Sequence, residues 1–178
     1  MLLRWSLLKA NNEDHDLAAD LATRAGLLLL EERKLSQNID AESLKQLGDQ
    51  KSHDFLMQEL ALSRPEDGVL SEEGSPNSVH PSRHESRRVW IIDPLDGTKE
   101  FSEPPRDDWA VHVALAIDGF PIAGAVSIPE LSLIFSTRDD FLGQSYSTNK
   151  EEVRIAVRRS GPPSEASLVV NEFEGTLV

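Results

Sequence analysis

Apolar side chains alternate with small or polar ones from Trp109 to Ile117, and this period of two is typical of a strand with one buried face. Asp118-Gly119 follows directly, and because both residue types tolerate positive φ, the pair predicts a two-residue type I′ hairpin. A return strand is predicted from about Ile122 to Ile128, then a turn at Pro129-Glu130 and a third pass from Leu131 to Ser136. The chain is therefore expected to contain an antiparallel meander.

Two helices are predicted before this meander. Apolar residues such as Leu17 and Leu21 recur at helical spacing in the segment Asp14–Arg33. The same pattern returns in Asp49–Ser63, where the following Arg64-Pro65 stops it because the residue before a proline disfavours the helical conformation.

Short strands and loops are predicted around and after these helices. A strand candidate at Val69–Ser71 is followed by a loop at 74–88 and by a buried, β-branched strand at Val89–Ile92. Past Thr137 the signal weakens, with one more strand predicted at Val153–Val157 and a loop at 160–163. Helices first and a meander later give an α+β order, so we expect a layered α/β architecture with paired helices on an antiparallel sheet.

Composition narrows the class of protein. The chain has 178 residues, and 31 acidic against 18 basic side chains give a formal net charge of −13. Phosphate backbones are held chiefly by Lys and Arg, so this balance argues against a nucleic acid polymer as partner. No apolar run approaches the roughly 20 residues of a membrane-spanning helix, and no secretory signal is recognised. With no cysteine, we expect a globular cytoplasmic protein without a membrane partner.

The segment Asp93-Pro94-Leu95-Asp96-Gly97-Thr98 carries the most informative polar groups. Two carboxylates three residues apart suit Mg²⁺, which prefers oxygen ligands, and the N–H groups of Gly97 and Thr98 at the start of a helix could cradle a phosphate oxygen. An ordinary Asp-Gly turn after a strand is the alternative interpretation. Glu72 and Glu73 at the end of the preceding strand either form an acidic pocket with these aspartates or lie in a solvated loop.

Histidines give weaker signals. His80 and His84 have a spacing that binds Zn²⁺ on a helix, but Pro81 and the serine-rich context favour a loop. His112 alternates with the core residues of its strand and is expected to face the other side of the sheet.

The motif Asp93–Thr98 resembles the core motif of the inositol monophosphatase superfamily of metal-dependent, lithium-sensitive phosphatases. Trp90-Ile91-Ile92 before it, Ser71-Glu72-Glu73 and Gly48-Asp49-Gln50-Lys51 are further matches. Lys99-Glu100-Phe101 directly after the motif is similar to the bacterial bisphosphate nucleotidase branch, whereas inositol phosphatases tend to have Thr-Asn-Phe there. The resemblance covers the chain from the first helix to about residue 137, and more loosely to residue 163.

The resemblance implies a set of metal ligands. Glu72 would bind the first metal, Asp93 would bridge two, the main-chain carbonyl of Leu95 would complete the first site, and Asp96 would bind the second. Glu73 would be a less direct neighbour. The cofactor implied is Mg²⁺, as two or three ions, with inhibition by lithium.

The resemblance also implies catalytic and substrate-binding groups. Thr98 together with Asp49, from the start of the second predicted helix, would orient and activate the attacking water. The amides of Gly97 and Thr98 would hold the phosphate. Two cations about 4 Å apart stabilise both the attacking and the leaving oxygen of an in-line phosphoryl displacement, which agrees with these roles.

The resemblance implies a layered αβαβα sandwich, of which residues 1–178 would form the N-terminal portion of a single domain, with its core at 14–137. Family members usually carry a later Trp-Asp-x-Ala-Ala-Gly-like motif whose aspartate completes the second metal site, and no such motif occurs before Val178. The second metal site and the leaving-group pocket are therefore expected to be incomplete in this chain.

The function expected from the resemblance is a Mg²⁺-dependent phosphomonoesterase acting on a small phosphate ester, most like a 3′(2′),5′-bisphosphate nucleotidase that converts 3′-phosphoadenosine 5′-phosphate to AMP and phosphate. One alternative keeps the chemistry and changes the substrate to an inositol or sugar phosphate. A second alternative is a catalytically incomplete fragment that acts as a metal-binding or interaction module, with a homodimer formed through a sheet edge.

Overall fold

The computed structural model describes residues 11–73 and 86–138, and beyond these only short strands at 154–155 and 176–177. The chain divides into two compact units, Met1–Asp140 and Phe141–Val178, and each is described by itself. The expectation of a single domain over residues 1–178 therefore stays a prediction. His80, His84 and the loop predicted at 160–163 lie outside the described residues.

The first unit begins with two long helices, α1 (Asn12–Leu35) and α2 (Ala41–Ser63). Helix α1 agrees with the predicted segment, and a capping box between Asn11 and Asp14 fixes its start. Helix α2 begins at Ala41 and not at the predicted Asp49, because Asp40 caps it and the buried Leu44 anchors its first turns. Asp49 therefore lies inside the helix, which corrects the expectation that it stands at the helix start.

Five strands of the first unit form one sheet in the order β1-β2-β3-β4-β5. They are β1 (Gly68–Ser71), β2 (Arg88–Asp96), β3 (Ala110–Ile117), β4 (Phe120–Ile128) and β5 (Leu133–Ser136). The predicted meander is confirmed as β3-β4-β5, whose pairs are antiparallel. Strand β1 pairs with β2 in parallel, so the sheet is not purely antiparallel; the connection of residues 72–87 is long enough for the crossover that parallel strands need.

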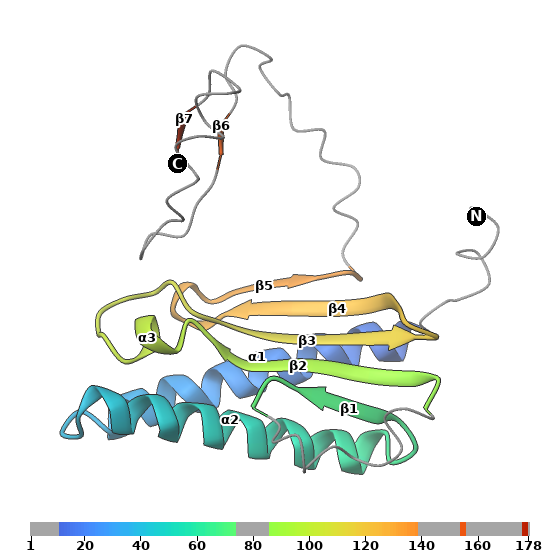
Figure 1. Ribbon diagram of the computed structural model, residues 1–178, viewed down its shortest axis with the longest axis horizontal. Coiled ribbons are helices and arrows are strands. Elements are labelled where there is room, and N and C mark those ends of the chain that lie inside the picture. Colours follow the sequence, from blue (N-terminus) through green and yellow to red (C-terminus); the bar gives the residue numbers. More distant parts are fainter. Residues whose placement is uncertain (1–10, 74–85, 139–153, 156–175, 178) are drawn as a thin grey trace. The chain divides into compact units, whose positions relative to one another are not determined.

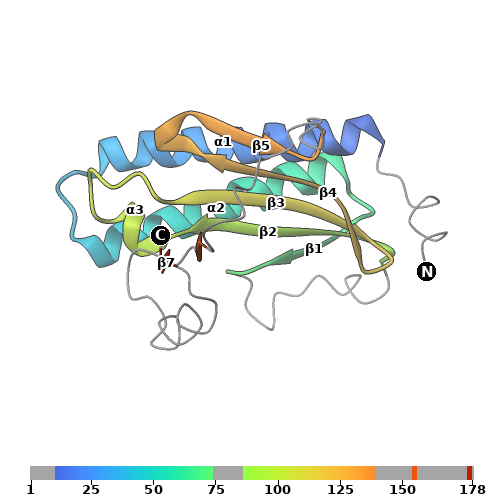
Figure 2. The same cartoon turned by 90° about the horizontal axis from the view of Figure 1, so that it is seen from above.

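Both long helices cover the same face of this sheet (Figures 1 and 2). Alternate residues of each strand point toward the helices, so Trp90 of β2 and Val113 of β3 are buried while Ile91 is 42% exposed. The core comprises residues from both helices and the three central strands, among them Leu21, Leu29, Leu56, Leu60, Trp90, Ile92, Val111, Val113, Leu115 and Ala125. The period-two pattern thus separates a helix-covered face from a second face.

A hairpin turn and a register shift shape the two ends of the pair formed by β2 and β3. The hairpin between β3 and β4 has positive φ at both Asp118 (51°) and Gly119 (80°), as the predicted turn requires. Strand β2 continues through Pro94 to Asp96 and does not end at Ile92 as predicted. A register shift between Asp93 and Asp96 takes Pro94 out of regular pairing with β3, which explains how a proline is tolerated there.

The second unit contains a parallel two-stranded sheet of β6 (Arg154–Ile155) and β7 (Thr176–Leu177). Strand β6 falls within the strand predicted at Val153–Val157. Within the described ranges, every helix is too short or too polar to cross a membrane.

A buried ion network joins the N-terminal end of α1 to the start of β2. Asp14 is 2% exposed, and its Oδ1 accepts hydrogen bonds from Nη2 of Arg88 at 2.8 Å and from Nη2 of Arg64 at 3.3 Å. Arg88 also binds Asp67, which accepts the Trp90 indole N–H at 2.8 Å. Burial raises the pKa of Asp14, but the hydrogen bond and charge of Arg88 outweigh it and hold the pKa below its usual value.

We predict that Asp14→Asn lowers the free energy of unfolding by about 2 kcal/mol, because two arginines lose a buried anionic partner. Equilibrium urea unfolding measures the loss. The matched control is Asp20→Asn on the same helix, because the Asp20 carboxylate pairs with Arg24 at the surface. This variant should lower the free energy of unfolding by less than about 0.5 kcal/mol. Equal stability of the Asp14 and Asp20 variants would contradict the assigned role of the network.

Candidate metal centre

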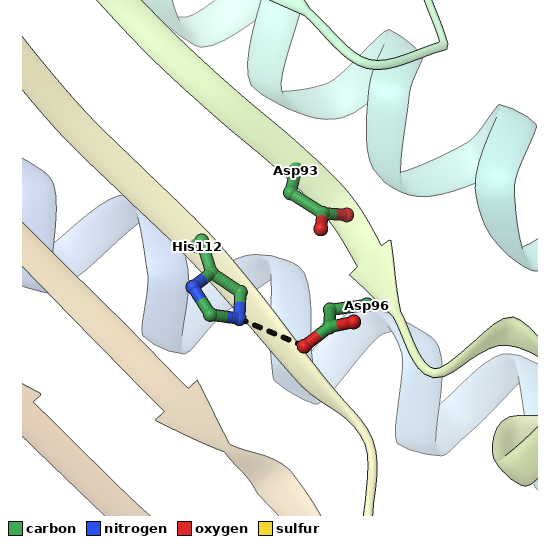
Figure 3. Close-up of side chains that lie close together, drawn as sticks. All are labelled: Asp93, Asp96 and His112. Carbon is green, nitrogen blue, oxygen red and sulfur yellow. Dashed lines mark hydrogen bonds and ion pairs between the residues drawn. The ribbon is translucent and has the colours of Figure 1, made fainter. Parts of the chain in front are cut away.

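A group of three ligand-bearing side chains lies where β2 and β3 run side by side. Asp93 of β2 is the register partner of His112 of β3, and Asp96 follows after the register shift. One ligand atom from each of these residues lies within 4.8 Å of the other two. Figure 3 shows the two carboxylates and the imidazole converging in front of the sheet, with helix α1 behind it.

The group occupies the sheet face that the long helices do not cover. Val111 and Val113, the neighbours of His112, are fully buried toward the helices. The His112 side chain is 40% exposed and that of Asp96 is 60% exposed. The prediction that His112 faces the other side of the sheet is therefore confirmed, and this is the side that carries the aspartates.

The sequence did not identify His112 as a candidate site residue. Its Nε2 lies 3.2 Å from Oδ2 of Asp96. Alternation within one strand places a side chain on a face, but the pairing of His112 with Asp93 depends on the register between two strands. The signal that was available is that a histidine interrupts an otherwise apolar or small series from Ala110 to Ile117.

The turn after β2 brings backbone and hydroxyl groups next to the aspartates. The N–H of Leu95 donates to Oδ1 of Asp93 at 3.2 Å, and the Thr98 hydroxyl donates to the Leu95 carbonyl at 3.2 Å. Gly97 has φ of 81° and caps the short helix α3 (Thr98–Phe101), so the predicted helix start is confirmed. A Cβ at Gly97 would lie 3.0 Å from the Asp108 carbonyl oxygen, which explains the need for glycine.

Helix α2 supports this turn from the core side. Gly48 lets the helix approach closely, because a Cβ there would lie 2.7 Å from Cε1 of Phe101 and 3.0 Å from Cδ2 of Leu95. One turn further along, the buried Ser52 hydroxyl donates to the Pro94 carbonyl at 2.7 Å. The helix that carries Asp49 is thus fixed against the segment that carries Asp93 and Asp96.

The end of β1 adds Glu72 to the same region. The N–H of Glu72 donates to the Ile92 carbonyl at 3.1 Å, so Glu72 extends the parallel pairing of β1 with β2 beside Asp93. His53 of α2 lies 2.8 Å from the Ser71 hydroxyl, which ties the end of β1 to the helix. Three segments that are distant in sequence therefore meet here.

The electrostatics show that these carboxyl groups act on one another. Burial, followed by the charges of Glu73, Asp93 and Glu72, raises the pKa of Asp49 to about 7. Burial, followed by the charges of Glu72 and Asp96, raises the pKa of Asp93 to about 6, while His112 opposes this shift. Carboxyl groups that repel one another in this way favour the binding of a positive ion.

The donor set fits a hard divalent cation. Asp93 and Asp96 offer carboxylate oxygens, the charge of Glu72 acts on Asp93, and the Leu95 carbonyl lies in the turn between the two aspartates. Mg²⁺ takes oxygen ligands from one or two carboxylates and keeps waters for exchange with substrate. The structure places ligand atoms of Asp93 and Asp96 within reach of one another, whereas Glu72, Glu73 and Asp49 are linked to this group through the effects of charge on the pKa values of Asp49 and Asp93. The roles expected for Asp49, Glu72, Gly97 and Thr98 stay predictions.

The sequence model of the inositol monophosphatase family matches residues 11–176. The 3′-phosphoadenosine 5′-phosphate phosphatase of Mycobacterium leprae is 39% identical over 166 residues, which cover 88% of this chain and 60% of that protein. The 3′(2′),5′-bisphosphate nucleotidase CysQ of Escherichia coli K12 is 35% identical over 116 residues, which cover 63% of this chain and 44% of that protein. The chain spans roughly half the length of these relatives.

Solved structures share the fold. The crystal structure of CysQ from Bacteroides thetaiotaomicron matches with a TM-score of 0.74 at 21% identity, over 93% of this chain and 71% of that one. Inositol monophosphatase II from Staphylococcus aureus MSSA476 matches with a TM-score of 0.67 at 22% identity, over 89% and 64%. These likenesses confirm the predicted fold class. Since the family's sequence model also spans residues 11–176, the chain belongs to the inositol monophosphatase family.

Proposed function

We propose that the chain carries the metal-binding half of a Mg²⁺-dependent phosphomonoesterase that acts on a small phosphorylated metabolite. The observation that supports this most directly is the convergence of carboxyl groups from α2, the end of β1 and the end of β2, with the pKa values of Asp49 and Asp93 raised to about 7 and about 6. Carboxylates alone would repel a phosphate group. Cations held by these carboxylates would reverse the local charge and bind the phosphate.

In this proposal Glu72, Asp93, the Leu95 carbonyl and Asp96 hold two or three cations. When bound, Mg²⁺ lowers the pKa of a coordinated water and stabilises the charge that develops on the transferred phosphoryl group. Asp93, whose pKa is raised by the charges of both Glu72 and Asp96, would be the carboxylate that these two ligands share a cation with. Lithium inhibition is expected because the family is lithium-sensitive.

Thr98 and Asp49 are proposed to handle the attacking water. The Thr98 hydroxyl already lies 3.2 Å from the Leu95 carbonyl, one of the proposed ligands. A carboxyl group whose pKa is raised to about 7, as that of Asp49 is, accepts and releases protons near neutral pH, which suits a general base. The amides of Gly97 and Thr98 are proposed to hold a phosphate oxygen.

The proposed substrate is 3′-phosphoadenosine 5′-phosphate, converted to AMP and phosphate. It is supported by the names of the Mycobacterium leprae and Escherichia coli relatives and by Lys99-Glu100-Phe101 after the core motif. An inositol or sugar phosphate is the alternative substrate, favoured by the fold shared with the Staphylococcus aureus inositol monophosphatase. Phosphate release from the adenosine bisphosphate and from inositol monophosphate, compared under identical conditions, discriminates between them.

A non-catalytic metal-binding module is the second candidate function, favoured by the group of ligand atoms from Asp93, Asp96 and His112. In that case the chain binds metal, and a homodimer or another partner completes the pocket. Phosphate release that appears only when a separately made C-terminal half is added would favour this candidate over a self-sufficient enzyme.

We predict that Asp93→Asn and Asp96→Asn each lower Mg²⁺-dependent phosphate release at least about a hundredfold, since loss of even an outer-shell partner typically costs 10- to 100-fold. The fold should persist, because Asp93 is only partly buried and Asp96 is exposed. Phosphate release and circular dichroism are the measurements, and the surface variant Asp20→Asn is the control. Parent-like rates in both site variants would show that the site is wrongly assigned.

We also predict an unusual pH dependence of stability without divalent metal. The folded-state pKa values of Asp49 and Asp93 lie above the ordinary 3.8, at about 7 and about 6. At pH values between the ordinary pKa and these raised values, the folded state therefore binds more protons than the unfolded state. In EDTA, the free energy of unfolding should therefore fall as pH rises from about 4 to about 7.

Urea unfolding at several pH values measures this dependence. Asp49→Asn should flatten it, and saturating Mg²⁺ should restore stability at neutral pH because the ion replaces the protons. A free energy of unfolding that rises over this pH range in EDTA, with no response to Mg²⁺, would contradict the assigned electrostatics.

A further inference from the structure

His112 stands at the proposed metal centre with its ring turned toward the carboxylates (Figure 3). Its backbone is held in the middle of the sheet, between Asp93 of β2 and Val126 of β4. Its Nε2 lies 3.2 Å from Oδ2 of Asp96, and its side chain is 40% exposed. A histidine in this position contributes little to the core, because the core lies on the other face of the sheet.

The nitrogen changes the chemistry of the donor set. Mg²⁺ prefers oxygen ligands throughout, whereas imidazole nitrogen suits Zn²⁺ and other divalent transition metals. Ligands of Zn²⁺ lie about 2.0–2.2 Å from the ion, so two ligands of one ion lie at most roughly 4.4 Å apart. The ligand atoms of Asp93, Asp96 and His112 lie within 4.8 Å of one another, which is close to this limit.

We propose that Asp93, Asp96 and His112 form a mixed nitrogen and oxygen site that binds a divalent transition metal, represented by Zn²⁺, in competition with Mg²⁺. The inference deepens the proposed function, because it concerns the same two aspartates and adds a way in which the site is regulated. A transition metal held by His112 occupies the carboxylates that Mg²⁺ needs, so the centre responds to the ratio of the two metals.

A purely positioning role for His112 makes a different prediction. If the imidazole only orients Asp96 through the 3.2 Å contact, its loss weakens the binding of Mg²⁺ and of Zn²⁺ by similar factors. If the imidazole is a ligand, its loss weakens Zn²⁺ selectively. The comparison of the two metals therefore separates the roles.

The test is calorimetric titration of the metal-free full chain with ZnCl₂ and, separately, with MgCl₂. His112→Asn is the test variant because it removes the Nε2 atom that faces Asp96 and keeps a polar side chain on the strand. His15→Asn on α1, whose ring contacts the Thr137 hydroxyl, is the control for loss of a histidine elsewhere. We expect His112→Asn to weaken Zn²⁺ binding at least about tenfold while the Mg²⁺ affinity changes less than about threefold. The His15 variant should match the parent for both metals.

A second readout is direct. In nitrogen-15 spectra of histidine side chains, Zn²⁺ should shift the Nε2 resonance of His112, and excess Mg²⁺ should reverse the shift. Absence of Zn²⁺ binding by the parent, unchanged Zn²⁺ affinity in His112→Asn, or equal losses for both metals would each overturn the proposal. These measurements use no phosphate ester. Zn²⁺ binding through His112 in a chain that hydrolyses no phosphate ester would therefore contradict the proposed activity and leave the proposed Zn²⁺ site in place.

Discussion

Mutual repulsion among carboxyl groups is the constraint on which the account of this protein depends. Asp49, Glu72 and Asp93 come from three segments that the fold brings together, and burial and like charge raise the pKa of two of them. The arrangement is costly unless cations or protons neutralise it. Packing opposes the repulsion: the close approach at Gly48 and the hydrogen bond from Ser52 to Pro94 fix α2 against the turn.

The two faces of the sheet carry different groups of residues. One face is covered by α1 and α2 and holds the core, while the other presents Asp93 and His112 at one end of neighbouring strands. At the start of β2, the buried carboxylate of Asp14 is neutralised by Arg88 and Arg64, and its pKa is held low. Aspartate is therefore neutralised by arginines beside the start of β2, whereas the aspartates at the end of β2 lack such partners among the described residues and are proposed to bind a metal.

Local sequence determined the parts of the fold that local forces control. Asp118-Gly119 predicted the hairpin because positive φ at both residues is a property of that dipeptide. The start of α2 was missed, since Asp40 and Leu44 provide a cap and an anchor without an apolar repeat. The family motif pointed to the carboxylates of the proposed site. The approach of His112 to Asp96 depends on strand register and on the irregularity after Asp93, which no local pattern encodes.

The most direct measurement is Mg²⁺ binding by calorimetry near pH 6.5 in buffers of different ionisation enthalpy, with and without inorganic phosphate. A centre whose carboxyl groups include Asp49 with a pKa of about 7 must release protons when the cation binds. We expect saturable Mg²⁺ binding, proton release on binding, and tighter binding in the presence of phosphate. Binding that is absent, or that releases no protons and ignores phosphate, would contradict the proposed metal centre.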